Sequence, residues 1–209
     1  MEQKYAPHPL YCAGTLETPL VQPKISIVGS RNAEEDGLLE AARVAREAVE
    51  NGVVVISGLA KGIDTAAHRA AIKHSGRTVG VIGTPLDKAY PRENAALQQQ
   101  MVEEQLVVSQ FPVGYNTQRR SFVERNRTMA LLTDATVIIR ASDRSGSLHQ
   151  GWEALRLGRP LFLSRTVMND PELEWPEEMT KYGARELCRF EDMLAYLPPS
   201  VDRPGLLNA

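Results

Sequence analysis

The sequence predicts an α/β protein built on a doubly wound, mainly parallel sheet with helices on both faces. From residue 24 onward, short apolar runs rich in β-branched residues alternate with helical patterns. The short runs are continuously apolar, as expected of strands that are buried on both faces. Because such units cross over in a right-handed sense, the loops that follow the strands are expected at one edge of the sheet.

The expected elements follow one another in a regular order. An extended arm over 1–23 carries one short strand at 10–13, and the sheet domain follows over 24–197. A proline-rich tail over 198–209 is expected to be flexible. The expected strands of the domain are 25–29, 53–57, 78–83, 106–109, 136–140 and 160–164, and the expected helices are 35–51, 63–75, 93–104, 122–133 and 147–157.

Composition argues against several classes of protein. A chain of 209 residues with 43% hydrophobic residues can fill one core. Its longest apolar runs are strand-sized and its N-terminus lacks a signal-peptide pattern, so no membrane contact is expected. Cys12 and Cys188 lie far apart and match neither a metal site nor a disulfide framework. We therefore expect a cytoplasmic protein without a metal or other cofactor.

Charge is distributed unevenly along the chain. The net charge of −2 argues against a bulk polyelectrolyte binder, yet residues 112–149 carry six arginines and three acids. Residues 168–179 carry five acids and no base. A local basic surface can bind nucleic acid on a slightly acidic protein, although ordinary solvated arginines would give the same count.

The loop after the first strand of the domain predicts an anionic ligand. Gly29, Ser30 and Arg31 come directly after an apolar run. Glycine allows a backbone or a phosphate to come close, serine offers a hydroxyl, and arginine presents a fixed fork of donors that suits phosphate. Because open α/β sheets bind ligands at this edge, the sequence predicts a phosphate-bearing ligand there.

The second loop resembles a phosphate-binding turn. Ser57, Gly58, Lys61 and Gly62 stand between a strand and a helix. Backbone N–H groups at the helix start are expected to receive an anion, and Lys61 to add a positive charge. The loop lacks the Gly-Lys-Ser/Thr ending of a Walker A motif, and a simple strand-to-helix turn is the alternative.

Two later loops are expected to reach the same edge. In one, Arg144 precedes Ser145, Gly146 and Ser147. Ser147 is expected to cap the next helix, whose free N–H groups form an anion site. The other loop, over 83–94, is interpreted as a turn followed by a capped helix.

A basic helix start over 121–127 contributes Arg125, Asn126 and Arg127. The two arginines lie two residues apart and cannot share one helix face. We expect one of them to contact the ligand and the other to pair with an acid such as Glu124 or Asp134. A solvated helix start is the alternative.

Asp64 and His68 stand four residues apart, a spacing that permits a hydrogen bond on one helix face. A histidine oriented by a carboxylate can act as a general base. We favour a structural role, in which Asp64 stabilises the first helical turn and His68 fixes the helix to a neighbouring loop. No catalytic residue is therefore assigned.

Together these segments resemble the DNA-processing protein A family, also called DprA or Smf, whose Rossmann-like domain is related to that of the LOG phosphoribohydrolases. The resemblance covers roughly residues 7–164. The matching segments are PLYCAGTLETPLVQP (9–23), ISIVGSR (25–31), VVVISGLAKGIDTAAHRAAI (53–72), TVGVIGTPLDKAYPRENAAL (78–97), VSQFPVG (108–114), FVERNRTMALLTDATVII (122–139) and RSGSL (144–148).

This resemblance implies single-stranded DNA binding in DNA processing, natural transformation or recombination. Arg31 and Lys61 would contact the DNA, with the loops around 125–127 and 145–147 in the same pocket. Tyr90, Tyr115 and Phe122 are candidates for stacking on bases, although core packing is favoured for Phe122. The resemblance further implies a homodimer and a RecA-type recombinase as partner. We expect a minimal member of the family, without the helical and winged-helix domains that commonly flank this fold there.

A nucleotide-binding protein, or a LOG-like hydrolase of the N-glycosidic bond of nucleoside monophosphates, is the alternative function. In that family a Pro-Gly-Gly-x-Gly-Thr run is followed by a glutamate. Residues 144–147 replace the run here, and the place of the glutamate falls to His149 or Gln150. Neither is a substitute for a carboxylate, so DNA binding is the favoured hypothesis.

Overall fold

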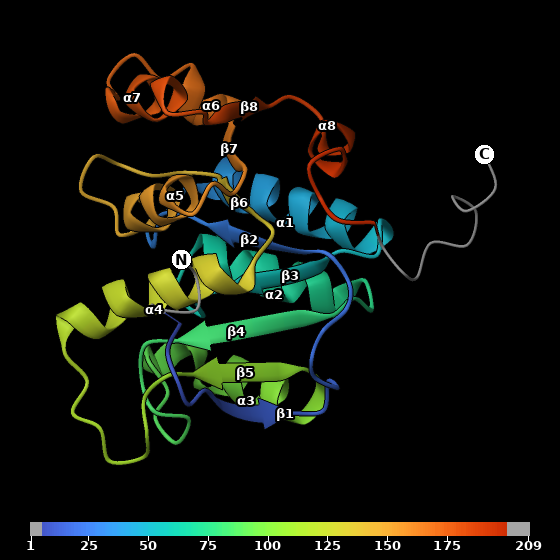
Figure 1. The fold of residues 1–209 in the computed structure, drawn as a ribbon, viewed down its shortest axis with the longest axis vertical. Coiled ribbons are helices and arrows are strands. Elements are labelled where there is room, and N and C mark those ends of the chain that lie inside the picture. Colours follow the sequence, from blue (N-terminus) through green and yellow to red (C-terminus); the bar gives the residue numbers. More distant parts are fainter. Residues whose placement is uncertain (1–5, 200–209) are drawn as a thin grey trace.

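Eight strands form one sheet in the order β1-β5-β4-β3-β2-β6-β7-β8, seen in Figure 1. The structure is a computed structural model that describes residues 6–199. All neighbouring strands are parallel except β1, which pairs antiparallel with β5. The predicted fold class, a Rossmann-like and mainly parallel α/β sheet, is therefore confirmed.

The strands are β1 (Tyr11–Gly14), β2 (Lys24–Val28), β3 (Val54–Ser57), β4 (Thr78–Ile82), β5 (Leu106–Ser109), β6 (Ala135–Ile138), β7 (Leu161–Ser164) and β8 (Arg185–Leu187). The helices are α1 (Glu35–Glu50), α2 (Ile63–Lys73), the 3₁₀ turn η2 (Arg92–Asn94), α3 (Ala95–Glu104), α4 (Arg119–Leu132), α5 (Ser147–Arg156), α6 (Arg165–Met168), α7 (Trp175–Lys181) and α8 (Phe190–Leu194).

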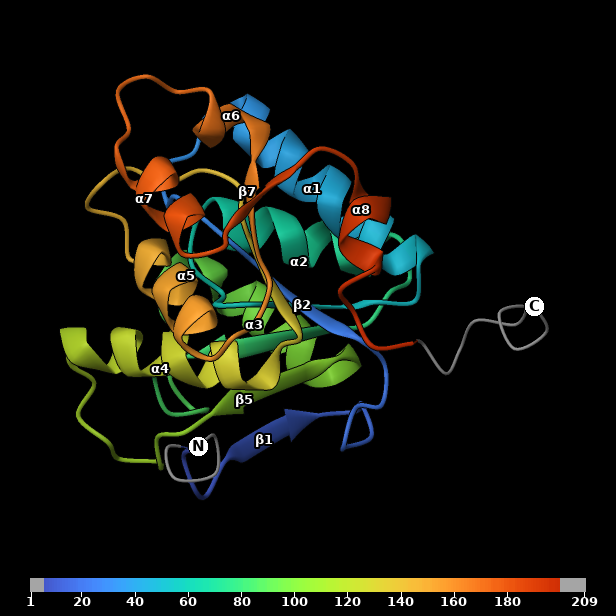
Figure 2. The same ribbon diagram turned by 45° about the horizontal axis from the view of Figure 1, so that its top comes forward.

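Two helical layers cover the sheet, because successive side chains of each strand point to opposite faces. Ile25 and Ile27 of β2 pack in the same cluster as α1 and α2, whereas Val28 packs with Met129 of α4. Figure 2 shows α4 and α5 on the other side of β2 from α1 and α2. Both faces of the central strands are therefore buried, which explains their continuous apolar sequence.

The strand order reverses between β2 and β6, which are neighbours although three strands and four α-helices separate them in the chain. Ligands of open α/β sheets bind outside the carboxyl ends of the strands at such a point. The two loops stay joined beyond the strands, because the Ser30 N–H donates to the Arg140 carbonyl at 2.6 Å. The loop of Gly29, Ser30 and Arg31 therefore starts at the reversal itself.

The chain after β7 contains elements that the sequence patterns did not predict. Three short helices, α6, α7 and α8, and the strand β8 extend the sheet and its covering layers. Their apolar residues are buried against the core, among them Trp175, Met179 and Phe190. At the other end, β1 extends the sheet beyond β5. Most of the predicted flexible tail, residues 200–209, lies outside the described residues, as do residues 1–5.

Candidate functional site

Two adjoining cavities of about 720 and 630 Å³ lie at the carboxyl ends of the strands. They share Arg31, Ala60, Tyr90, Phe122 and Arg125, so we treat them as one site and call it the edge cleft. Its walls come from the loops after β2, β3, β4 and β6 and from the start of α4. The tertiary structure thus brings together segments that are more than a hundred residues apart in the chain.

Most of the predicted site residues line this cleft, and four do not. The residues that line it are Gly29, Arg31, Gly58, Lys61, Arg125, Asn126, Arg144, Ser145, Gly146 and Ser147. Ser57 is buried, and its hydroxyl donates to the Ile27 carbonyl at 2.6 Å. Ser30 borders a smaller neighbouring cavity, Gly62 precedes α2 with a φ of 73°, and Arg127 is half-buried on α4.

Arg125 is buried under the cleft and holds the loop after β3. Its Nη1 donates to the Gly58 carbonyl at 2.5 Å and to the Val81 carbonyl at 2.7 Å. A Cβ on Gly58 would overlap the guanidinium, so only glycine fits there. We expected Arg125 or Arg127 to pair with Glu124 or Asp134, and for Arg125 this was wrong, because burial directs its donors to backbone carbonyls.

Those two carboxylates have other partners. Glu124 lies 3.9 Å from Arg120, and Asp134 lies 3.5 Å from Lys24 and 3.8 Å from Arg159. The charge that faces Arg125 is instead that of Asp64. For Arg125, the expected pairing with a carboxylate nearby in the sequence is therefore replaced by an electrostatic interaction with Asp64 of α2.

Asp64 holds the same loop from the other side. Its Oδ2 accepts hydrogen bonds from the Gly58 N–H at 3.1 Å and the Ala60 N–H at 3.3 Å. Burial raises the pKa of Asp64, although Arg125 and the two backbone amides oppose the shift. Burial likewise lowers the pKa of Arg125, and Asp64 opposes that shift. The Asp64–Arg125 pair thus fixes the backbone that presents Lys61.

His68 does not pair with Asp64, which contradicts the general-base arrangement. Its Nδ1 lies 2.7 Å from the Thr78 hydroxyl, which donates to the Val55 carbonyl at 2.8 Å. The hydroxyl has one hydrogen, so Nδ1 is the donor to Thr78. Burial lowers the pKa of His68 to about 3. The favoured structural role of His68 is therefore confirmed, although His68 fixes α2 to the strand β4 and not to a loop.

The loop after β6 forms the opposite wall of the cleft. The helix α5 begins at Ser147, with Gly146 at the N-cap and no side-chain cap, so the prediction that Ser147 caps the helix was wrong. The Ser145 and Ser147 hydroxyls instead lie 2.6 Å apart. Asn126 Nδ2 donates to the Gly146 carbonyl at 2.9 Å. Asn126 thus holds this loop against α4, and Arg144 remains exposed.

Aromatic side chains lie between the two walls. The rings of Tyr90 and Phe122 have centroids 5.0 Å apart, and the Arg31 guanidinium lies 5.8 Å from the Phe122 centroid. Phe122 is half-buried and lines the cleft, so core packing was the wrong expectation for it. Tyr90 is 46% exposed. Tyr115 stacks on Phe111 at 4.6 Å and does not line the cleft.

Sequence reasoning missed four cations of the cleft. Lys88 and Arg92 belong to the loop over 83–94, which was interpreted as a turn, and Arg119 and Arg120 open α4. The available signal was the basic character of both segments. Lys61 pairs with Glu93, and this hydrogen bond holds the pKa of Glu93 below its ordinary value.

Neither a metal cluster nor a membrane span is found within residues 6–199. There, no group of three or more His, Cys, Asp and Glu side chains is placed to hold a metal ion. In the same range, every helix is too short or too polar to cross a bilayer.

Comparison with known proteins identifies relatives of most of the chain. The family model of DNA recombination-mediator protein A matches residues 1–198. DNA processing protein DprA of Streptococcus pneumoniae is 37% identical over 190 residues, which are 91% of this chain and 67% of that protein. The chain spans about two thirds of the length of the first curated relatives that it matches.

Solved structures agree with the sequence relatives. The X-ray structure of DNA processing protein A from Streptococcus pneumoniae matches with a TM-score of 0.82 and 36% identity, over 91% of this chain and 66% of that one. The protein from Helicobacter pylori matches with a TM-score of 0.79 and 28% identity, over 90% of this chain and 86% of that one. The latter structure was described for its single-stranded DNA binding mode.

Proposed function

The chain belongs to the DNA recombination-mediator protein A family, and on that premise we propose that it binds single-stranded DNA at the edge cleft during DNA processing, uptake or recombination. The observation that carries the proposal is the distribution of charge along the cleft. Lys61, Lys88 and Arg92 line one cavity, Arg119, Arg120 and Arg144 line the other, and Arg31 lines both. A row of separated cations suits a repeating phosphate backbone better than a single phosphate.

The aromatic pair supports a single strand in particular. Tyr90 and Phe122 line both cavities, and their ring centroids lie 5.0 Å apart. Unpaired bases stack on such rings, whereas the bases of a duplex are already stacked on one another. We assign phosphate contacts to Arg31, Lys61 and Arg144, and stacking to Tyr90.

The remaining predicted residues act by positioning. Arg125 holds Gly58, and Asn126 holds Gly146, so that the loops present their exposed cations. Ser57 and Gly62 shape the turn before α2, and Gly29 and Ser30 join the loops at the strand reversal. Arg127, which does not line the cleft, has no assigned contact with DNA.

The LOG-like hydrolase is disfavoured by the carboxylates of the cleft. Among the residues that line it, the only acids are Asp64 and Glu93. Asp64 accepts two backbone N–H groups, and Glu93 pairs with Lys61. Glu153 lies outside the lining and binds Arg156 at 3.0 Å. A carboxylate free to stabilise a ribosyl cation is therefore missing from the described lining.

The proposal includes a homodimer that extends the cationic row across two subunits, and a RecA-type recombinase as the protein partner. It also includes a cytoplasmic setting. Cys12 and Cys188 are exposed and unpaired, as is usual in a reducing compartment. We retain the division into an arm (1–23), a Rossmann-like domain (24–197) and a tail (198–209) as part of this proposal.

Titration of a labelled oligo-dT strand at two salt concentrations tests the proposal. The wild type is compared with Arg31→Ala/Lys61→Ala and with Arg156→Ala/Arg189→Ala, which removes two exposed cations outside the cleft. Binding should weaken as salt rises, collapse in the first variant and persist in the second. No binding at low salt, together with release of free base from AMP, would overturn the proposal in favour of the hydrolase.

A further inference from the structure

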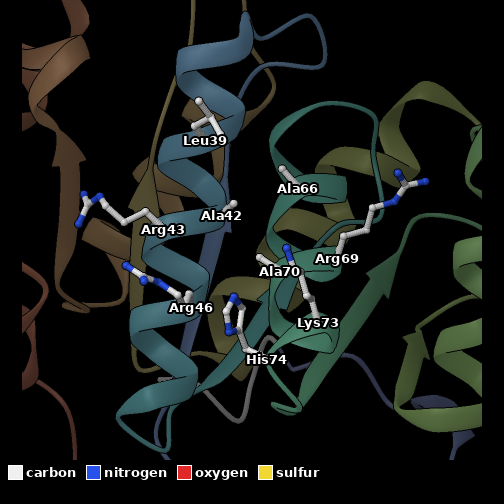
Figure 3. Close-up of a pocket in the computed structure, with 9 residues that line it drawn as sticks. All are labelled: Leu39, Ala42, Arg43, Arg46, Ala66, Arg69, Ala70, Lys73 and His74. Atoms are coloured by element: carbon white, nitrogen blue, oxygen red, sulfur yellow. The ribbon is translucent and has the colours of Figure 1, made fainter.

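A second basic surface lies on the outer side of α1 and α2. A groove of about 410 Å³ runs between the two helices, and Figure 3 shows the side chains around it. None of the residues that line this groove lines the edge cleft. The helical groove is thus a separate site, and the proposed DNA binding does not account for it.

The floor of the helical groove is apolar. Ala42 of α1 and Ala66 and Ala70 of α2 lie along the gap between the helices in Figure 3. Their short side chains leave room for another backbone to approach closely. Leu39 stands at one end of the groove and is 63% exposed. An apolar side chain placed here would therefore be partly removed from water.

Basic side chains of both helices lie beside this floor. Arg46, Arg69, Lys73 and His74 are exposed side chains of the lining. Within the described residues, Arg69 and Lys73 have no ion pair, and Arg46 lies 3.8 Å from Glu50. The surface therefore carries positive charge that the folded chain does not neutralise.

The acids near the groove belong to α1 and are engaged on that helix. Arg43, the fifth basic residue of the lining, binds Glu47 at 2.8 Å and lies 3.9 Å from Glu40. On the α2 side, where Arg69 and Lys73 stand, no acid lines the groove. The available positive charge is thus concentrated along α2.

We propose that the helical groove is a docking site for an acidic, amphipathic helical segment of another protein. Acidic side chains of such a segment would meet Arg69, Lys73 and Arg46, and its apolar side chains would cover the alanine floor. A helix laid in a groove presents its residues in this way, with apolar anchors every three or four positions.

Single-stranded DNA fits the same groove less well. The lining contains no Phe, Tyr or Trp ring on which a base could stack, in contrast to Tyr90 and Phe122 of the edge cleft. Its walls are the sides of two helices, whose backbone N–H groups are used within the helices. Phosphates would also gain nothing from the alanine floor. Charge complementarity combined with an apolar floor therefore favours a protein segment.

A synthetic peptide tests the proposal on the full chain. The probe is a labelled helical peptide of about 20 residues, long enough to form a helix, with glutamates around leucines spaced three and four apart. A matched peptide carries lysine in place of each glutamate. The acidic peptide should bind at low salt, and the lysine peptide should not. Failure of the acidic peptide to bind, or equal binding of both, would overturn the proposal.

Charge reversal locates the binding site. Arg69→Glu/Lys73→Glu should weaken binding of the acidic peptide by about tenfold or more, because close charges across an interface are strongly coupled. Arg69→Gln/Lys73→Gln should give a smaller loss. The matched control Arg156→Glu/Arg189→Glu changes the net charge equally at exposed positions outside the groove and should bind as the wild type does. Equal binding by the two charge-reversed proteins would contradict the assignment.

Two further measurements test the alternative occupants of the groove, which are single-stranded DNA and a second copy of this chain. Oligo-dT binding should be retained by Arg69→Glu/Lys73→Glu, and its loss without any peptide binding would assign the groove to DNA. Sedimentation should show the same oligomeric state for this variant and the wild type, and dissociation of an oligomer would assign the groove to a second copy. Because the groove and the edge cleft share no residues, failure of this proposal leaves the DNA-binding proposal intact.

Discussion

The two walls of the edge cleft are held in different ways. The loop between β3 and α2, residues 58–62, is fixed by the buried side chains of Arg125 and Asp64 through four hydrogen bonds. Three of these bonds end on the loop, and the fourth, to Val81, anchors the arginine. The loop between β6 and α5, residues 139–146, has its exposed part at 142–146 and is held there by Asn126 and by the Ser145–Ser147 contact.

This difference separates two roles for polar residues of one cleft. Under the β3–α2 loop, a change of side chain alters the folded structure and its stability, because buried charges and carbonyls lose their partners. On the β6–α5 loop, substitution of an exposed side chain alters the charge that a ligand meets and has little effect on stability. The contrast predicts that stability and DNA affinity respond to different substitutions.

The largest effect is expected from Arg125→Ala. The substitution leaves Asp64 buried without its counter-charge and leaves the Gly58 and Val81 carbonyls without a donor. The free energy of unfolding should fall by about 3–5 kcal/mol, because a buried charge and two buried carbonyls lose their partner. Urea denaturation measures this change. Arg120→Ala, at a side chain that is 69% exposed on the same helix, is the control and should change stability by less than about 0.5 kcal/mol.

A pair of glycine substitutions contrasts the two loops directly. An alanine Cβ at position 58 would overlap the Arg125 guanidinium, whereas one at position 146 meets nothing within 4 Å. Gly58→Ala should therefore destabilise the protein by up to about 3 kcal/mol, and Gly146→Ala should be nearly neutral. Thermal unfolding of both variants checks this. Equal melting temperatures would show that the β3–α2 loop adapts more easily than its contacts indicate.

His68 should make the free energy of unfolding depend on pH. This residue lies on α2, the helix that follows the β3–α2 loop. Its pKa is lowered to about 3 in the folded protein and stands at 6.5 in the unfolded chain. Between these values the unfolded chain binds more protons, so stability falls as pH falls. From pH 7 to pH 5 this amounts to about 2 kcal/mol.

Denaturation of wild type and His68→Gln at both pH values measures this contribution. The raised pKa of Asp64 acts in the opposite direction but is common to both proteins, so it cancels in the comparison. The wild type should lose more stability than the variant on acidification. Parallel losses in the two proteins would show that His68 does not stay neutral in the fold.

The smallest effect is expected on the β6–α5 loop. Arg144→Ala removes an exposed cation of the cleft without touching a buried partner. Affinity for oligo-dT at low salt should fall by several-fold to about tenfold, and the salt dependence should weaken by roughly one phosphate contact. The unfolding free energy should stay the same. A loss of stability without a loss of affinity would reverse the roles assigned to the two loops.

The amino-acid sequence by itself determined the layered α/β fold, the positions of most strands and helices, and the edge at which the loops meet. The expected strands over 24–164 end within two residues of the observed ones. Such features depend on local periodicity, on glycines at turns and on the handedness of crossovers, all of which a short window of sequence contains. The elements α6, α7, α8 and β8 were missed because they are short and are stabilised by packing against the core.

Only the tertiary structure decided which cations face the ligand and which support the fold. Arg31, Arg125 and Arg144 are equivalent in sequence terms, each a basic residue near the end of a strand or the start of a helix. Arg125 is buried because the α4 helix crosses over the loop at Gly58, and the other two remain exposed. A contact between residues 67 positions apart depends on how the helices pack, which no local pattern encodes.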